Sequence, residues 1–398
     1  MSEGKPSALF PSYARFPITI VKGKGSHLWD DQGKEYLDFV SGLAVTNLGH
    51  VPDSVKAKLV AQLDELWHVS NLFHIPQQEK LAWLLTDNSC ADAVFFCNSG
   101  AEANEAAIKI ARRYNAKVLG RDRYEIITFH SSFHGRTLAT LTATGQDKVK
   151  EGFHPLPEGF VYVPYNDVAA IKGSITGKTC AIMLELLQGE GGVNPASQEF
   201  VQEVARLCRE HDLLLIVDEI QTGMGRTGKL FAYEHYGIEP DIFTLAKGLG
   251  SGFPLGAMLA KGKLIEAFAA GSHGSTFGGT PIAMAAGIAT LETMLAERLP
   301  ERVAALGETF MGMLNEELGR NPLVKEVRGK GFLIGIECTA PVAGIIAAIH
   351  ERGLLVVSAG PQVIRLLPNF LVTEEELRQA TAIIGAVLAE TAATAVNG

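Results

Sequence analysis

Two charged residues stand where apolar segments end, and they are the first candidates for chemistry. Asp218 follows the apolar run LLLIV (213–217), and Lys247 follows the mostly apolar segment 241–246. A buried carboxylate needs a cation or a hydrogen-bond donor, and a buried amine must be neutralised or paired. Lysine amines in such surroundings form Schiff bases. Asp218 could hold a metal ion, although no histidine is near it in the sequence, or a protonated ring nitrogen; a lysine whose amine merely reaches solvent is the plain alternative for Lys247.

A third candidate site is the segment NSGAEANE (98–105), which follows a predicted strand. Ser99 can cap the next helix, and Glu102 completes a capping box. The free backbone N–H groups and the dipole at such a helix start suit a phosphate group. Helix capping alone would also explain Ser99.

Two further segments carry side chains that could bind a ligand. Phe133 and Arg136 follow a predicted strand, where an aromatic ring could stack on a flat ligand and a guanidinium could bind a carboxylate. Glu190 lies among three glycines in a tight loop. Core packing, a surface charge and a simple turn are the structural alternatives for these three residues.

The elements that must position these residues alternate between helix and strand from about residue 51. This alternation predicts an α/β fold with an open, mostly parallel sheet flanked by helices on both faces. Ligands in such sheets bind outside the carboxyl ends of the strands, where the candidate residues stand. The predicted strands are Ala93–Cys97, Glu125–Phe129, Cys180–Leu186, Leu213–Val217, Asp241–Ala246 and Leu255–Ala260, and the predicted helices are Asp53–Leu66, Gln77–Leu85, Ala101–Val118 and Gln198–His211.

The two ends of the chain have a different pattern, which predicts a separate small α+β domain. We expect an N-terminal segment, 1–50, associated with this small domain, a large domain over 51–285, and the C-terminal small domain over 286–398. Residues 1–12 should form a loose arm. The expected strands are Ile18–Val21, His27–Trp29, Tyr36–Val40, Val324–Arg328, Phe332–Glu337, Leu354–Ser358 and Val363–Leu366, and the expected helices are 284–297, 300–319, Val342–Arg352 and one from Thr373.

Composition excludes several classes of function. The formal net charge is −9 and no long Lys/Arg run occurs, so we expect no nucleic-acid partner and no membrane partner. The five cysteines are scattered and odd in number, which argues against a disulfide framework or a structural zinc site. The N-terminus lacks the layout of a secretory signal, so we expect a cytoplasmic protein.

Two glycine-rich segments imitate nucleotide-binding motifs. GMGRTG (223–228) matches GxGxxG, but it does not open a long helix directly after a strand, so a dinucleotide site is not predicted. The segment 177–179 (GKT) resembles the end of a P-loop, but its spacing is wrong and it precedes a strand.

Taken together, the motifs resemble the class III aminotransferases of fold type I, and the resemblance covers nearly the whole chain. Within that family the chain looks most like the acetylornithine aminotransferases. The motifs of the family are NSGAEANE (98–105), FHGRT (133–137), QGEGG (188–192), VDEIQTGMGRTG (217–228), LAKGLGSGFPLGA (245–257) and STFGG (275–279). The narrower likeness rests on YARFP (13–17), LWDDQGKEYLDF (28–39), LGH (48–50) and RLLPN (365–369).

The resemblance implies pyridoxal 5'-phosphate as the cofactor and assigns the residues that bind it. Lys247 would form a Schiff base with the cofactor and later move the proton, and Asp218 would keep the pyridine nitrogen protonated. The remaining cofactor contacts would be Ser99, Gly100 and Ala101 on the phosphate, Phe133 and Ile220 on the two ring faces, Gln221 on the phenolic oxygen, and Thr276 on the phosphate of the neighbouring subunit in a homodimer.

The resemblance also implies the substrates. The reaction would move the terminal amine of N2-acetylornithine to 2-oxoglutarate, as in arginine biosynthesis. Arg136 would bind the α-carboxylate of acetylornithine, and Arg365 that of glutamate or 2-oxoglutarate. Glu190 would pair with Arg365 in the first half-reaction and release it in the second.

Other readings remain open at this point. Ornithine, succinylated substrates or 4-aminobutyrate could be the amine donor, although the apolar Leu43 stands about where ornithine aminotransferases tend to carry a tyrosine. A regulator that binds the cofactor without turnover is the alternative from another class.

Overall fold

The computed structural model describes residues 7–397, and its largest sheet has seven strands in the order β4-β12-β11-β10-β7-β5-β6. β12 runs antiparallel to both of its neighbours, and the other neighbouring strands pair in parallel. The prediction of a mostly parallel sheet is therefore confirmed. The strands are β4 (Ala93–Cys97), β5 (Glu125–Phe129), β6 (Phe160–Val163), β7 (Thr179–Leu184), β10 (Leu214–Asp218), β11 (Ile242–Leu245) and β12 (Gly256–Ala260).

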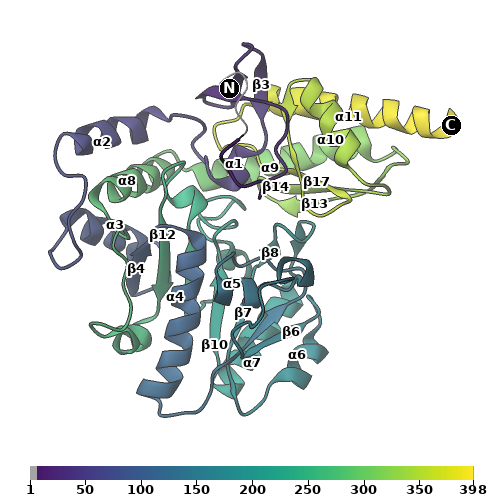
Figure 1. Ribbon diagram of the computed structural model, residues 1–398. Helices are drawn as coiled ribbons and strands as arrows, with labels where there is room; N and C mark the ends of the chain where they lie inside the picture. The colour runs from purple at the N-terminus through teal and green to yellow at the C-terminus, as the bar shows by residue number, and fades with distance from the viewer. Residues whose placement is uncertain (1–6, 398) are drawn as a thin grey trace.

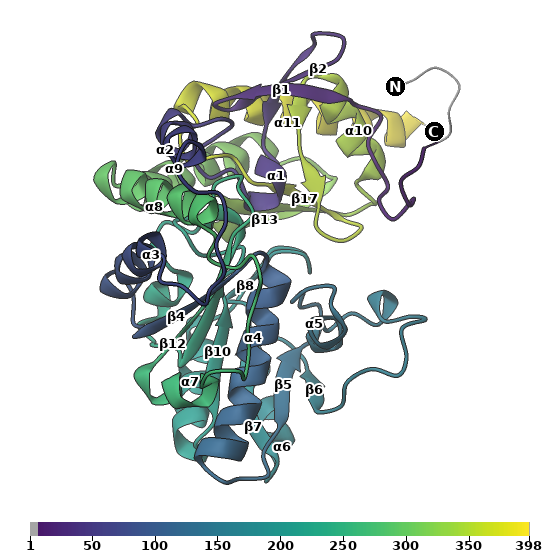
Figure 2. The same cartoon turned by 60° about the vertical axis from the view of Figure 1, so that its left-hand side comes forward.

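Helices cover both faces of this sheet (Figures 1 and 2). Ile110 of α4 (Gly100–Arg113) lies in one core cluster with Ile216, whereas Phe200 of α7 (Gln198–His211) lies in another with Leu215. Successive strand residues point to opposite faces, so both faces of β10 are buried. The other helices of this half are α2 (Asp53–Leu63), α3 (Pro76–Asp87), α5 (Leu138–Ala143), α6 (Val168–Ser174) and α8 (Pro281–Ala296).

The N-terminal strands and the C-terminal elements lie together in the other half of the molecule, at the top of Figure 1. One four-stranded sheet has the order β1-β2-β3-β15 and another has the order β13-β14-β17-β16. This arrangement agrees with the expected association of the two chain ends, and the boundaries at residues 50 and 285 stay a prediction. The strands are β1 (Ile20–Lys24), β2 (His27–Asp30), β3 (Glu35–Asp38), β13 (Val324–Lys330), β14 (Leu333–Cys338), β15 (Leu354–Leu355), β16 (Val357–Ser358) and β17 (Val363–Leu366), and the helices are α9 (Leu299–Leu318), α10 (Ala343–Glu351) and α11 (Glu374–Asn397).

Several predicted elements differ from the structure. The strand expected over Leu354–Ser358 is two short strands, β15 and β16, that belong to different sheets. The helix expected over Ala101–Val118 ends at Arg113 and continues as a π-helical turn, Tyr114–Val118. The sequence analysis missed α5, α6, β6 and a small hairpin of β8 (Leu187–Gln188) and β9 (Asn194–Pro195), which are short and flanked by turns. Residues 7–12 of the expected loose arm have no helix or strand, and residues 1–6 lie outside the described part. Short 3₁₀ turns span Asp147–Val149, Ala232–Tyr236, Lys247–Leu249 and Gly262–Phe268.

The segment labelled α1 (Ser41–Ala44) is a left-handed turn that the sequence analysis did not predict. All four residues have positive φ, from 48° at Ser41 to 68° at Leu43. Left-handed conformations cost about 1–2 kcal/mol per non-glycine residue, so neighbouring contacts must hold the turn. The Asp38 carboxylate accepts from the backbone N–H groups of Val40 at 2.8 Å and Ser41 at 3.1 Å, and the Ser41 hydroxyl donates to the Leu367 carbonyl at 2.6 Å.

Within residues 7–397, none of the helices is both long enough and apolar enough to cross a membrane.

Candidate active site

A cavity of about 440 Å³ opens at the carboxyl ends of the strands of the large sheet. Its lining comes from residues that follow different strands, as expected for an α/β sheet. Among them are the predicted residues Ser99, Gly100, Ala101, Phe133, Arg136, Asp218, Ile220, Gln221 and Lys247. Four motifs that are far apart in the sequence therefore meet at one site.

Asp218 and Lys247 come from the ends of neighbouring strands. β10 pairs with β11 in parallel, with Asp218 opposite Thr244, and Lys247 lies just beyond the end of β11. Asp218 is 3% exposed. Its carboxylate is therefore removed from water at the floor of the cavity and depends on protein donors.

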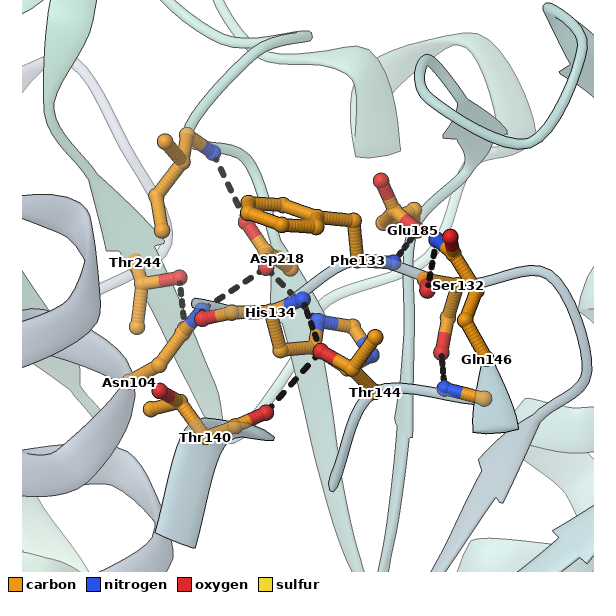
Figure 3. A network of polar contacts seen from close by, with 12 residues as sticks. Asn104, Ser132, Phe133, His134, Thr140, Thr144, Gln146, Glu185, Asp218 and Thr244 are labelled. Atoms are coloured by element: carbon orange, nitrogen blue, oxygen red, sulfur yellow. Dashed lines mark hydrogen bonds and ion pairs between the residues drawn. The ribbon is translucent and has the colours of Figure 1, made fainter. Parts of the chain in front are cut away.

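Three donors hold the Asp218 carboxylate in place (Figure 3). The side-chain amide of Asn104 and the Nδ1 of His134 both lie 2.8 Å from Oδ2, and the backbone N–H of Ile220 lies 3.0 Å from Oδ1. Asn104 in turn accepts from the Thr244 hydroxyl at 2.8 Å. Hydrogen bonds of this kind fix the direction in which a carboxylate points.

Lys247 lines the same cavity as this carboxylate. Among the described residues, its Nζ has no hydrogen-bond or ion-pair partner. Burial lowers the pKa of Lys247 below the ordinary lysine value, and the carboxylates of Glu190 and Asp218 oppose this shift only in part. Lys247 also has a φ of 42°, a sparsely populated conformation. The site thus presents a nucleophilic amine that is more readily deprotonated than a surface lysine.

The start of α4 forms an anion site on the cavity wall. Ser99 is the N-cap and accepts from the Glu102 backbone N–H at 3.2 Å, while the Glu102 carboxylate accepts from the backbone N–H of Asn98 at 2.7 Å. The predicted N-cap at Ser99 is confirmed, but Glu102 does not close a capping box, because it binds the N–H of Asn98 and not that of Ser99. The first N–H groups of a helix have no intrahelical acceptor, so those of Gly100 and Ala101 remain available to a ligand.

Phe133 and Arg136 lie on one side of the cavity. The backbone N–H of Phe133 donates to the carboxylate of Glu185 at 3.1 Å, which ties the aromatic residue to the end of β7. The Arg136 guanidinium lies 5.4 Å from the centroid of the Phe133 ring, and Arg136 is exposed. An exposed guanidinium beside a cavity can bind an incoming carboxylate without first breaking an ion pair.

Arg365 and Glu190 pair with each other and do not line the cavity. Nη1 of Arg365 lies 2.6 Å from the Glu190 carboxylate, and it also donates to the carbonyl of Gly189 at 2.9 Å and to the side-chain oxygen of Gln221 at 3.2 Å. Burial alone would raise the pKa of Glu190, but the Arg365 charge outweighs it and the pKa is lowered. The Glu190 carboxylate is therefore ionised near neutral pH.

Thr276 is the third predicted site residue, after Glu190 and Arg365, that does not line this cavity. It is exposed on the loop before α8 and is absent from the cavity lining. A contact with the site of the same chain is thus not made.

Three residues of the site were missed by the sequence analysis, namely Asn104, His134 and Glu185. Asn104 and His134 lie inside motifs that had been quoted, but their contacts with Asp218 join residues more than 80 positions apart. Glu185 is buried on the cavity wall, and burial, followed by the Asp218 charge, raises its pKa well above the usual range. The sequence offered one clue to all three residues: each lies just after a strand or within the helix that follows a strand.

Glu219, which is next to Asp218, and the glycine-rich GMGRTG segment have structural roles. Glu219 points away from the cavity and accepts from the Thr222 hydroxyl at 2.6 Å and the Tyr233 backbone N–H at 2.9 Å. Arg226 of the GMGRTG segment is 1% exposed and donates to backbone carbonyls of the other half of the molecule, including that of Phe332 at 3.2 Å. In the part of the chain that the structure describes, no group of three or more His, Cys, Asp or Glu residues is placed to hold a metal ion.

Comparisons with known proteins identify the family of the chain. A family model described as aminotransferase class III matches residues 10–388. The acetylornithine aminotransferase of Halalkalibacterium halodurans is 55% identical over 382 residues, which cover 96% of this chain and 98% of the relative. The acetylornithine aminotransferase of Bacillus subtilis is 54% identical over 375 residues, covering 94% and 96%.

Solved structures give the same result. The ornithine aminotransferase of Toxoplasma gondii, described with PLP at partial occupancy in its active site, superposes with a TM-score of 0.93 at 33% identity, covering 97% of this chain and 93% of that one. The acetylornithine aminotransferase of Elizabethkingia anophelis has a TM-score of 0.86 at 33% identity, with 96% of each chain covered. The resemblance seen in the motifs is confirmed over nearly the whole length, and this chain belongs to the class III aminotransferases.

Proposed function

We propose that this aminotransferase moves the terminal amine of N2-acetylornithine to 2-oxoglutarate, giving N-acetylglutamate 5-semialdehyde and glutamate in arginine biosynthesis. The relatives that are about half identical to the chain carry the name acetylornithine aminotransferase. The observation that carries the proposal is the placement of the Lys247 amine and the Asp218 carboxylate on neighbouring strand ends of one cavity.

The residues of the cavity fit pyridoxal 5'-phosphate, the cofactor of this family. The N–H groups at the start of α4 suit its phosphate, the Asp218 carboxylate suits a protonated pyridine nitrogen, and the Lys247 amine, which has no partner among residues 7–397, suits its aldehyde. The cavity of about 440 Å³ lies within the range of ordinary small-molecule sites. When bound, the cofactor supplies an aromatic ring that accepts an electron pair from the substrate.

The chain's own residues would bind and orient this ring. Ser99 and the N–H groups of Gly100 and Ala101 would hold the phosphate. Phe133 and Ile220 would pack on its two faces, because both line the cavity.

Proton movement would depend on two residues and hydrogen bonding on a third. Lys247 Nζ would take a proton from the substrate carbon that bears the amine and return it at C4′, and its lowered pKa favours the neutral form that such a base needs. Asp218 would hold a proton at the ring nitrogen. Gln221 would donate a hydrogen bond to the phenolic oxygen.

Two arginines would bind the carboxylates of the two substrates. The exposed Arg136 would bind the α-carboxylate of acetylornithine. Arg365 would bind glutamate or 2-oxoglutarate only after Glu190 withdraws, because the pair is closed at 2.6 Å. With acetylornithine bound, Glu190 would keep the Arg365 charge neutralised.

A homodimer is the assembly that we propose. Thr276 is exposed and outside its own cavity, where it could reach the phosphate in a partner's site. Large apolar side chains around it are exposed, including Phe277 at 61%, Leu72 at 90% and Phe73 at 65%. Exposed apolar patches of this kind mark protein–protein interfaces.

The test is a panel of amine donors with 2-oxoglutarate: acetylornithine, succinylornithine, ornithine and 4-aminobutyrate. We expect the highest kcat/KM with acetylornithine, and a higher value with any other donor would refute the proposed substrate. Lys247→Ala should retain the cofactor noncovalently and lose nearly all turnover, because the base is gone. Lys150→Ala removes another lysine of low exposure, one that lies over the Tyr162 ring outside the cavity, and should stay active.

A further inference from the structure

The turn that carries Glu190 contains a strained residue. β8 and β9 form an antiparallel hairpin whose turn runs from residue 189 to 193. Val193, at the end of this turn, has a φ of 55° and is fully buried. Positive φ is an outlier for a β-branched residue and persists only where the surroundings hold it. The turn is therefore held from outside.

One of these holding contacts comes from the β13-β14 sheet in the other half of the molecule. Val193 lies in a core cluster with Leu333 of β14 and Val363 of β17. Gly335 lies directly beneath it, because a Cβ added there would come within 2.8 Å of the Val193 Cβ. The valine side chain thus inserts into a gap in β14 that only glycine leaves open. Figures 1 and 2 both place β8 next to β13, at the junction of the two halves.

Arg328 on β13 makes the second holding contact. Its Nε donates to the carbonyl of Val193 at 3.0 Å, and its Nη2 donates to the carbonyl of Gly192 at 2.6 Å. A planar guanidinium presents its donors in a rigid fork, whereas the donors of a lysine ammonium all belong to one nitrogen on a flexible stem. The side chain is 14% exposed, so these bonds are shielded from solvent.

Acidic neighbours keep the Arg328 fork in position. Nη1 pairs with the carboxylates of Glu337 on β14 and Glu326 on β13. Hydrogen bonds from Lys325 and from Arg328 lower the pKa of Glu337, so it is ionised near neutral pH. The carboxylates thus orient the guanidinium through Nη1, while Nε and Nη2 bind the carbonyls of the turn.

We propose that Arg328 and Val193 are positioning residues that set the place of Glu190 against Arg365, and so set how readily Arg365 is released for a dicarboxylate. This inference rests on the proposed function, because it concerns the balance of the two half-reactions. Neither residue lines the cavity. They act through the turn, which holds Glu190 and also offers the Gly189 carbonyl to Arg365.

The direction of the effect follows from this geometry. Without the Arg328 bonds, the turn moves more freely and Glu190 leaves Arg365 more readily. The site then binds glutamate and 2-oxoglutarate more readily. When acetylornithine is bound, Glu190 neutralises the Arg365 charge less completely. The ratio of kcat/KM for glutamate to kcat/KM for the amine donor should rise about tenfold. Damage to the fold alone would lower both values by the same factor.

The experiment compares Arg328→Ala with Arg302→Ala in the cofactor-loaded protein. Arg302 is a matched control, because it also bridges two backbone carbonyls, those of Phe370 at 3.0 Å and Val372 at 2.9 Å, away from the hairpin. Arg328→Lys keeps the positive charge but replaces the rigid two-nitrogen fork with a single nitrogen, so it should raise the ratio toward the value of Arg328→Ala. Single-turnover rates in each half-reaction, followed by the cofactor's visible absorbance, give the ratio.

Hydrogen exchange of the peptide 187–195 supplies a readout that needs no substrate. We expect faster exchange there in Arg328→Ala and wild-type exchange in Arg302→Ala. Unchanged exchange at 187–195, or equal loss of both half-reactions, would overturn the clamp. Failure of the wild-type protein to use acetylornithine would overturn the proposed donor instead, and the hydrogen-exchange comparison would still decide the clamp.

Discussion

Asn104→Ala is the sharpest test of how the site holds Asp218. The Asn104 side chain is fully buried and makes three contacts of 2.8 Å: its amide group donates to the Asp218 carboxylate and the His134 carbonyl, and its oxygen accepts from the Thr244 hydroxyl. The substitution removes all three contacts, and the groups left behind remain buried.

The expected loss can be worked from these contacts. A hydrogen bond to a charged group contributes about 1.5–3 kcal/mol, and a buried polar group left without a partner costs about 1–3 kcal/mol. Because these contributions are not additive, we expect the free energy of unfolding to fall by about 3–5 kcal/mol. The Asp218 carboxylate also loses one of three donors, so cofactor affinity should fall about tenfold, equivalent to about 1.4 kcal/mol.

Asn115→Ala is the matched control for this prediction. Asn115 is 1% exposed and its amide group donates to the carbonyl of Ala111 at 3.1 Å, about three helical turns beyond Asn104 and away from the cavity. Its loss should cost about 1 kcal/mol and leave cofactor affinity unchanged. The measurements are urea unfolding of the apoprotein and a fluorescence titration with the cofactor. Equal loss of stability in both variants, or wild-type cofactor affinity in Asn104→Ala, would refute the reasoning.

Three other predictions test the surroundings of the site. Burial raises the pKa of Glu219 to about 7 from 4.5; the folded protein therefore keeps this proton after the unfolded chain has lost it, so stability falls as pH rises from 4.5 to 7, by about 3 kcal/mol. Urea unfolding at pH 5 and pH 8 should show a smaller loss of unfolding free energy in Glu219→Gln than in the wild-type protein. An equal loss in both proteins would contradict the raised pKa of Glu219. Gly256→Ala would place a Cβ 2.5 Å from the Ser99 carbonyl oxygen and so displace the start of α4, which should weaken cofactor affinity about tenfold. In Gly262→Ala the new Cβ would lie 3.4 Å from its nearest neighbour, so this control should bind the cofactor normally in the fluorescence titration. Leu43→Gly relieves a φ of 68° and should raise the free energy of unfolding by about 1 kcal/mol; a loss in the melting temperature would show that its side-chain contacts matter more.

Much of the site could be predicted because its residues stand at strand ends. Asp218 and Lys247 are polar residues at the ends of apolar runs, and the rules of parallel sheets bring such positions to one edge. The capping pattern at Ser99 predicted the start of a helix. These signals are local, so a single sequence contains them.

The parts that escaped prediction depend on contacts between distant segments. His134 reaches Asp218 from another strand end, and the pattern around it said nothing of that partner. The strand expected over Leu354–Ser358 divides between two sheets because its halves pair with β3 and β17, which no local periodicity encodes. The left-handed turn at Ser41–Ala44 contains one glycine, and its other residues adopt positive φ under the hold of Asp38 and Leu367. Tertiary contacts decided each of these features.

The parallel pairing of β3 with β15 has a consequence for how the protein is made. Leu37 lies opposite Leu354, so an edge of the first sheet can close only after more than 300 further residues have left the ribosome. At about 5–20 residues per second, this takes roughly 15 to 60 s. The large sheet can assemble during that interval, since its strands lie between β4 and β12. The N-terminal hairpin meanwhile waits on the nascent chain with an open edge, which is the state in which it is most exposed to mispairing and to chaperones.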